Sequence, residues 1–414
     1  MEHQDLIPHL FRTEFRKIVS VLCRIFSLEH MEIAEDIAGE TFLLALQTWS
    51  YKGVPENPAA WLYQVAKNKT KNYLTRHQLF SSKIARQISQ LQEKEEEIDI
   101  DLSEKNMEDS QLQMLFALCH PSIPPEAQIG LSLRILCGFG IEEIATAFLT
   151  TKETINKRLS RAREKLRSEK ISMDLPLARE INNRLDTVLR TLYLLFSEGY
   201  YSESQDIILR KDFCLEAMRL TTQLTEYELT NKPEVNALLS LMCFHASRFE
   251  ARTNSQGEII LYEDQDESLW NQNLVAKGIF YLHLASTGNK LSKYHLEAAI
   301  AYWHTQKADT QEKWENILLL YNQLLQLEYS PVAALNRTYA LYKANGKEEA
   351  IAAAEKLELR NNHFYFTLLG ELYRDLDKEK AIQHFQKARD LAKNSTDRHL
   401  LSRKINEVNE EGEW

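Results

Sequence analysis

The sequence predicts an all-α protein, and three observations support this fold class. Glycine and proline are scarce, with 12 and 9 in 414 residues. Apolar residues recur three or four positions apart over long stretches, as in amphipathic helices, and the period-two alternation of strands is hard to find. A chain of this length has room for about two to four domains. The 44% hydrophobic content is enough to form sizeable cores.

Basic residues are concentrated in two segments of an acidic chain. The net charge is −10, which is unusual for a DNA-binding protein taken as a whole. Between Asn57 and Gln92 there is no acidic residue but six Lys or Arg, and the segment Lys157–Lys170 holds seven Lys or Arg against Glu164 and Glu169. Two local basic surfaces in an acidic protein indicate a DNA reader that also binds another protein.

The first two predicted helices form a small core. One helical face is expected over Ile7–Leu28, and the next helix lies in MEIAEDIAGETFLLALQTWSYKG. Asp36 and Glu40 are one turn apart on one side of that second helix. A different set of positions is expected to face the core: Ile33, Ile37, Phe42, Leu43 and Leu46.

A third helix combines aromatic rings with bases. Asn57 is a natural N-cap, and Pro58 occupies the first helical position. The helix PAAWLYQVAKNKTKNYLTRHQ then interleaves aromatic side chains with Lys and Arg. Rings that stack on unpaired bases, next to cations that follow phosphates, are typical of single-stranded nucleic-acid binding. Each ring taken singly is more often a core residue.

Residues Glu126–Arg167 read as a helix, a glycine-containing bend, a short helix, a turn and a longer helix. Thr150 or Thr151 can cap the longer helix. Its inward face is expected to be apolar and its outward face basic. This is the pattern of a helix-turn-helix with a major-groove recognition helix; the alternative is an ordinary amphipathic hairpin with a solvated charged face. The inward residues are Ile141, Ile144, Ala145, Phe148, Ile155, Leu159, Ala162 and Leu166, and the outward ones are Lys152, Thr154, Asn156, Lys157, Arg158, Arg161 and Arg163.

The segments AEDIAGETFLLALQTW, NPAAWLYQVAKNK and RLSRAREKLR together resemble regions two and four of an extracytoplasmic-function (ECF) sigma factor of the sigma-70 class. The resemblance covers Leu10–Arg167, with Gly39 and Leu149 as departures from the family pattern. It implies that the protein binds core RNA polymerase and promoter DNA. The implied polymerase-binding residues are Asp36, Glu40 and Phe42. For the −10 element they are Trp61, Asn68, Lys69, Asn72, Tyr73 and Arg76, and for the −35 element Thr151, Lys152, Thr154, Lys157, Arg158 and Arg161.

An acidic segment lies between the two basic ones. Glu93–Asp109 contains nine acids and two bases. A block of like charges repels itself, so the segment reads as a solvated spacer. The family resemblance implies a second interpretation, in which the linker threads the polymerase cleft along a path otherwise taken by nucleic acid.

The long carboxy-terminal part contains an internal repeat. Leu341-Tyr342, Ala350-Ile351 and Lys356 recur 31 positions later, and each unit reads as a helix pair. These units resemble tetratricopeptide (TPR) repeats, whose concave surface typically holds a peptide or protein ligand. With SEGYYSE, EDQDESLW and SPVAALNR, the extension resembles that of an ECF subgroup with a fused TPR-like region, which implies built-in regulation without a membrane partner.

The expected fold is therefore two small sigma helical domains followed by a helical repeat domain. The predicted domains are 1–80 (region two), 81–112 (acidic linker), 113–170 (region four), 171–290 (helical extension) and 291–414 (TPR-like repeats).

No catalytic constellation, cofactor or metal site is expected. The five cysteines are scattered and form no CxxC, which indicates structural thiols in a reduced compartment. Asp264 and Asp266 are candidate metal ligands or acid–base groups, although capping of a helix near Ser268 explains them more simply. The amino terminus lacks a signal-peptide pattern and no long apolar run occurs, so a cytoplasmic location is expected.

The favoured function is transcription initiation without catalysis by the protein itself. Two other classes fit parts of the sequence: a helix-turn-helix repressor with a ligand- or protein-sensing carboxy-terminal half, and a repeat-protein adaptor whose DNA-like motifs serve only as protein contacts. A repressor binds duplex promoter DNA unaided with salt-dependent affinity. A sigma factor binds promoter DNA tightly only together with core enzyme. An adaptor would bind DNA in neither way.

Overall fold

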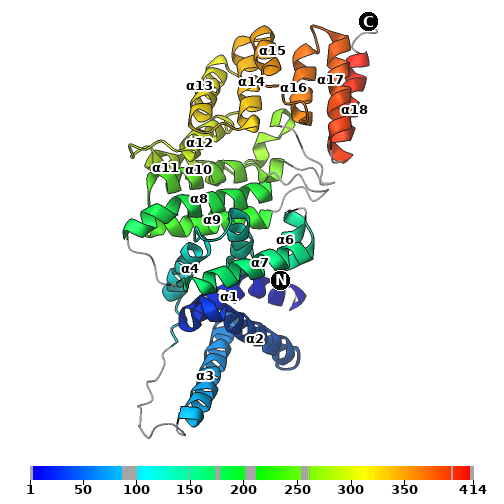
Figure 1. Ribbon diagram of the computed structural model, residues 1–414. Coiled ribbons are helices and arrows are strands. Elements are labelled where there is room, and N and C mark those ends of the chain that lie inside the picture. The colour runs from blue at the N-terminus through cyan, green and yellow to red at the C-terminus, as the bar shows by residue number, and fades with distance from the viewer. Residues whose placement is uncertain are drawn as a thin grey trace. The chain divides into compact units, whose positions relative to one another are not determined.

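The computed structural model describes residues 3–85, 100–148, 150–171, 173, 178–200, 211–252, 260, 262–392 and 395–410. Within these residues every regular element is a helix and none is a strand, so the predicted all-α class is confirmed. The chain divides into two compact units, Met1–Leu195 and Phe196–Trp414, which are described separately (Figure 1).

The first unit begins with three helices: α1 (His3–Phe26), α2 (Met31–Lys52) and α3 (Pro58–Ala85). Gly53, with φ 79°, ends α2 in a conformation that favours glycine. The predicted cap of α3 is confirmed, because the backbone N–H of Ala60 donates to Asn57 Oδ1 at 3.0 Å. Leu22 and Leu62 are completely buried and contribute to the core of the unit.

Shorter helices complete the first unit. A π-type turn, Ser132–Leu136, follows α5 directly, and the chain then bends at Gly138, where φ is 73°. The elements are α4 (Glu104–Leu118), α5 (Pro125–Leu131), α6 (Ile141–Ala147), α7 (Lys152–Ser168) and the first part of α8 (Ala178–Tyr200).

Helices α6 and α7 form the predicted helix-turn-helix. Thr151 is the N-cap of α7, and its hydroxyl accepts from the backbone N–H of Thr154 at 3.2 Å. The expected inward face of α7 is confirmed: it consists of the buried residues Ile155, Leu159, Ala162 and Leu166. Leu149, in the predicted turn, lies outside the described residues, as do residues 86–99 of the predicted acidic linker.

A buried glutamine joins α5 to α8. Gln128 Nε2 donates to the carbonyls of His120 and Ile123 at 3.1 and 3.0 Å. Its Oε1 accepts from the hydroxyl of Thr191 on α8 at 3.4 Å. The compact first unit therefore includes helical sequence beyond the recognition helix.

The second unit is built of α9 to α18, many of them antiparallel neighbours (Figure 1). Residues related by the 31-residue repeat occupy equivalent positions: Leu341 and Leu372 are buried, and Ala350 and Ala381 are completely buried. The bounds are α9 (Lys211–Glu226), α10 (Pro233–Ala246), α11 (Gln272–Ala285), α12 (Lys293–Trp303), α13 (Gln311–Leu327), α14 (Pro331–Asn345), α15 (Lys347–Glu355), α16 (His363–Tyr373), α17 (Lys378–Leu391) and α18 (Ser395–Glu410).

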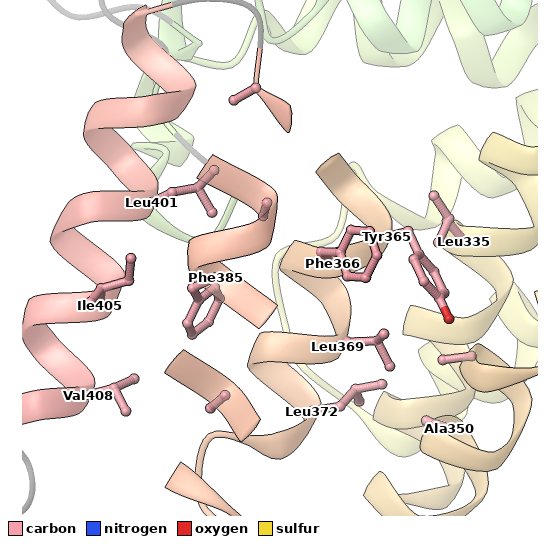
Figure 2. Packing of buried hydrophobic residues seen from close by; sticks show 14 residues of the cluster. Leu335, Ala350, Tyr365, Phe366, Leu369, Leu372, Phe385, Leu401, Ile405 and Val408 are labelled. Carbon is pink, nitrogen blue, oxygen red and sulfur yellow. The ribbon is translucent and has the colours of Figure 1, made fainter. Parts of the chain in front are cut away.

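The last helices of this unit share one apolar cluster (Figure 2). Leu401, Ile405 and Val408 lie along α18, and Phe385 of α17 lies beside them. On α16, Gly370 allows close approach, because a Cβ at this position would lie only 2.6 Å from the Phe385 ring. The phenyl ring therefore occupies space that any larger residue on α16 would take.

Gly370→Ala should destabilise the second unit by about 1–3 kcal/mol, because the added methyl group overpacks the core against Phe385. Chemical denaturation of the full chain measures the change. Gly39→Ala is the matched control: it lies within α2, has nothing within 4 Å of its Cβ position, and should be neutral or stabilising. A Gly370→Ala protein as stable as the Gly39→Ala protein would contradict this packing argument.

Candidate nucleic-acid and polymerase interfaces

Asp36 and Glu40 are both exposed on α2, on the side where the sequence predicted them. Glu40 Oε2 accepts a hydrogen bond from Lys69 Nζ of α3 at 2.6 Å, in a pair whose side chains are 63% and 28% exposed. A predicted polymerase contact is thus joined to a predicted −10 contact. Exposed pairs of this kind contribute only about 0–1 kcal/mol, so Glu40 can exchange partners at little cost.

The apolar residues that follow on α2 differ from the expectation. Phe42, predicted to contact polymerase, is only 3% exposed, and its ring packs at 5.1 Å from Phe11 in an edge-on arrangement. Leu43 and Leu46, predicted to face the core, are 54% and 48% exposed. The burial of Phe42 confirms that it faces the core, as its position on the helix predicted, whereas the expectation of buried Leu43 and Leu46 was wrong.

The exposed apolar residues lie beside the acidic pair. At about 100° of rotation per residue, Leu43, Leu44 and Tyr51 fall on the same side of α2 as Asp36 and Glu40. Tyr51 is 92% exposed. Leu44 and Tyr51 were not predicted as surface residues, although Leu44 lies four and Tyr51 eleven positions after Glu40, close to whole helical turns.

The predicted −10 residues of α3 divide into two groups. Asn68, Asn72 and Arg76 are exposed and follow one another at four-residue steps, so they share a face. Gln64 Nε2 donates to Asn68 Oδ1 at 3.0 Å. Trp61 lies on the same side, half-buried, with its ring edge-on to Trp49 at 5.3 Å. Together these side chains form a polar stripe, with the indole ring of Trp61 at its amino-terminal end.

Lys69 and Tyr73 occupy the adjacent side of α3. Lys69 is paired with Glu40, and the Tyr73 ring packs edge-on against Phe26 of α1 at 5.5 Å. Both side chains are half-buried. They join α3 to its neighbouring helices, whereas Asn68, Asn72 and Arg76 face solvent.

The N-cap and the first three turns of α7 carry the predicted −35 residues. Thr151, Lys152, Thr154, Lys157 and Arg161 are exposed. Lys152 Nζ donates to Glu142 Oε1 of α6 at 2.5 Å, and this hydrogen bond raises the pKa of the lysine and lowers that of the glutamate. Arg158 is half-buried, with its guanidinium 5.8 Å from the centroid of the Phe148 ring. The helix thus presents a basic face from its capped end, where recognition helices contact base edges.

Two further arginines of α7 face the start of α2. Arg163, predicted to point outward with the DNA-facing bases, instead donates from Nη2 to Glu35 Oε1 at 3.0 Å. One turn later, Arg167 Nη2 donates to Glu32 Oε1 at 2.8 Å. These four side chains line a polar cavity of about 380 Å³.

The second unit contains a cluster of cations and rings. Lys313 is only 2% exposed; its Nζ donates to the Gln306 carbonyl at 2.6 Å and the Tyr262 hydroxyl at 3.1 Å. Burial lowers the pKa of Lys313. Burial, with Arg248 and Lys313 nearby, lowers the pKa of His304 to about 3. The cluster therefore keeps His304 neutral.

This neutral histidine makes stability depend on pH. The folded chain binds no proton at His304 between about pH 6.5 and about 3, whereas the unfolded chain does. Its contribution is therefore complete above about pH 6.5 and is lost progressively as the pH falls towards 3. When the pH falls from 7 to 5, the free energy of unfolding should decrease by about 1–2 kcal/mol because of His304. Denaturation of the native chain and of His304→Gln at both pH values measures this term; equal pH dependence would contradict it.

The structure assigns structural roles to other candidate residues. Asp266 accepts from the backbone N–H of Ser268 at 2.9 Å as the cap of a short 3-10 helix, which confirms the simpler explanation for it. Among the described residues, no group of three or more His, Cys, Asp or Glu could hold a metal ion. All five cysteines are buried. Of the helices described, none combines the length and apolar character needed to cross a bilayer.

Known family models match both amino-terminal segments that carry these surfaces. Sigma-70 region 2 matches residues 10–80, which include α2 and α3, and sigma-70 region 4 matches residues 113–166, which include the helix-turn-helix. The chain belongs to the sigma-70 family. Members of this family are transcription initiation factors that bind core RNA polymerase and promoter DNA.

The comparisons also cover the rest of this sigma-70 family protein. Residues 184–286 match a family of unknown function, DUF6596. An uncharacterised protein of Rhizobium meliloti (strain 1021) is 32% identical over 384 residues, which cover 92% of this chain and 90% of the relative. That length must include much of the extension, so the relative shares it as well as the sigma regions. No solved structure matches the chain.

Proposed function

We propose that this protein is an ECF-type sigma factor whose activity is controlled by its own carboxy-terminal extension. One observation carries the proposal: three chemically different surfaces lie exposed on separate helices of the first unit. They are the acidic and apolar stripe of α2, the polar stripe of α3 and the basic face of α7. In this order, they suit the binding of core polymerase, the reading of the −10 element and the reading of the −35 element.

The stripe on α2 is the proposed polymerase-binding surface. Asp36 and Glu40 supply charge, and Leu43 and Leu44 supply apolar area next to them. An apolar centre with charged neighbours is the usual composition of a specific protein interface. Phe42 supports this surface from beneath, as part of the core.

The other two surfaces are the proposed promoter readers. Asn68, Asn72 and Arg76 offer hydrogen-bond donors and acceptors to bases exposed by melting, and Trp61 offers an aromatic ring. Each stacked base contributes about 1–3 kcal/mol, which helps to offset the cost of separating the strands. On α7, Lys157, Arg158 and Arg161 would bind the −35 element, with Thr151, Lys152 and Thr154 near its phosphates.

A reconstituted assay tests this assignment. The full chain should bind core RNA polymerase tightly, bind duplex promoter DNA weakly by itself, and start run-off transcription at a defined position when the two proteins are combined. Tight binding of duplex DNA by the chain alone would instead support a repressor. Binding of neither polymerase nor DNA would support an adaptor.

The extension is the proposed regulatory part. Its helix pairs offer a surface on which a peptide or protein partner would bind, as in other stacked-helix proteins. The test is a chain truncated after Tyr200, because the Thr191–Gln128 contact places the first part of α8 within the first unit. Unchanged transcription by the truncated chain in a purified system would contradict regulation by the extension.

A further inference from the structure

Three basic side chains surround the ring of Tyr262 in the second unit. The Arg248 guanidinium lies 5.4 Å from the ring centroid, and the His304 ring lies edge-on to it at 5.2 Å. Lys313 Nζ donates to the hydroxyl of the same tyrosine at 3.1 Å. Arg248 follows α10, His304 caps the end of α12, and Lys313 belongs to α13. The packing of these helices therefore brings two cations, Arg248 and Lys313, to one ring.

Neither Arg248 nor Lys313 pairs with a carboxylate in the described part of the chain, because both donate to neutral groups instead. Arg248 Nη2 makes one long hydrogen bond, of 3.4 Å, to the hydroxyl of Tyr200. Lys313 Nζ donates to the Gln306 carbonyl at 2.6 Å as well as to Tyr262. An ammonium group has three protons, so one donor of Lys313 has no acceptor among the described residues.

The acids near Lys313 do not neutralise it. Burial lowers the pKa of Lys313, and the charges of Asp309 and Glu267 only partly oppose this effect. Asp309 Oδ2 accepts from Lys343 Nζ at 2.6 Å, and Glu267 is exposed to solvent. Lys313 itself is only 2% exposed. Burying a cation without an opposite charge is costly, so an anion from outside the chain would stabilise this arrangement.

Further buried donors lie at the same place. Arg248 Nε is buried and makes no hydrogen bond to a described residue. Trp270 is 4% exposed, its ring lies 6.1 Å from that of Tyr262, and its indole N–H also has no acceptor in the described chain. Buried polar groups are nearly always hydrogen-bonded. Both groups are donors, so the partner that they lack is an acceptor, and the two cations favour an acceptor with negative charge.

We propose that this cluster is a binding site for a small organic carboxylate. Arg248 and Lys313 hold the carboxylate oxygens, since guanidinium and ammonium groups form short charge-assisted hydrogen bonds with carboxylates. The rings of Tyr262 and Trp270 pack on the apolar body of the ligand, which favours an organic anion over inorganic phosphate. Arg248 and Tyr262 are half-buried, so the ligand reaches them from solvent. The site lies wholly in the second unit and exists whether or not the first unit acts as a sigma factor.

Thermal unfolding of the full chain tests the site with benzoate, acetate and inorganic phosphate as probes, against chloride at the same pH and ionic strength. Benzoate should raise the Tm by about 3–6 °C at a ten-fold excess over its dissociation constant. Acetate should raise it less, because it lacks a body that packs on the rings, and phosphate should act like chloride. Equilibrium dialysis with labelled benzoate should give one bound molecule per chain. No binding of benzoate, or a phosphate effect as large as that of benzoate, would overturn the proposal.

Lys313→Met removes one of the two cations and keeps a side chain of similar length. The Gln306 carbonyl retains a donor in this variant, because the Tyr262 hydroxyl donates to it at 3.2 Å, so the chain should fold. Its dissociation constant for benzoate should rise by about ten- to a hundred-fold, the usual effect of losing a charge-assisted hydrogen bond. Arg248→Gln removes the other cation, should weaken binding to a similar degree, and decides the matter if Lys313→Met does not fold.

Lys293→Met is the matched control. Lys293 starts α12, about 15 Å along the helix from His304, and its Nζ pairs with Glu328 at 3.0 Å. This variant should bind benzoate like the native chain. Equal affinity of the native chain, Lys313→Met and Arg248→Gln would place the ligand elsewhere and refute the site. An equal loss in Lys293→Met would show an effect of net charge alone, which also contradicts it.

Discussion

Replacing Leu43 and Leu44 together with glutamate should lower the affinity for core RNA polymerase by about 100-fold or more. The two leucines are 54% and 37% exposed in the free chain. Burying a leucine at an interface contributes about 1.5–2 kcal/mol, and two such losses already correspond to at least 100-fold in the dissociation constant. The introduced carboxylates would add like-charge repulsion beside Asp36 and Glu40.

Binding of the variant to immobilised core polymerase measures this effect. Leu319→Glu is the matched control, because Leu319 is a similarly exposed leucine, at 55%, in the second unit. It should leave polymerase binding unchanged and show the general effect of a glutamate on solubility. Circular dichroism checks that the double variant folds. A folded double variant that binds polymerase like the native chain would remove α2 as the binding surface.

The second large effect concerns the recognition helix. Lys157→Ala combined with Arg161→Ala should weaken engagement of the −35 element by about 100-fold, since each base or phosphate contact contributes about 1–3 kcal/mol. Both side chains are exposed, in the second and third turns of α7. Core polymerase binding should change little, because neither residue lies on region two.

The holoenzyme is the appropriate species for this measurement. Its affinity for promoter DNA with an intact or a scrambled −35 element separates base reading from general attraction to phosphates. Lys165→Ala serves as the charge control: it lies further along the same helix and pairs with Glu169. If Lys165→Ala and the double variant lose the same affinity on both DNAs, α7 contributes charge only and does not read sequence.

The helix-turn-helix could be predicted closely because its residues differ strongly in polarity. On α7 the buried residues Ile155, Leu159, Ala162 and Leu166 stand among charged neighbours, so a single register satisfies the helical period. Periodicity did not reveal the role of Arg163. Its side chain does not point to solvent or into its own domain. It pairs with Glu35, which lies more than a hundred positions earlier in the chain.

The wrong expectation that Leu43 and Leu46 of α2 are buried has the opposite cause. Residues Phe42 to Leu46 are all apolar, so the sequence pattern does not identify the buried side of the helix. Tertiary packing decides it: Phe42 meets Phe11 and Phe15 of α1, which turns Leu43 and Leu46 towards solvent. Of the three apolar residues of this run that were expected to face the core, only Phe42 is buried.

Start-site selection by the reconstituted enzyme shows directly whether the chain acts as a sigma factor. Core RNA polymerase is combined with the full chain and a library of promoter fragments, and the 5′ ends of the transcripts are mapped. A sigma factor predicts transcripts from discrete sites, with shared sequence about 10 and about 35 base pairs upstream, only when the chain is present. Identical 5′ ends with and without the chain would contradict it.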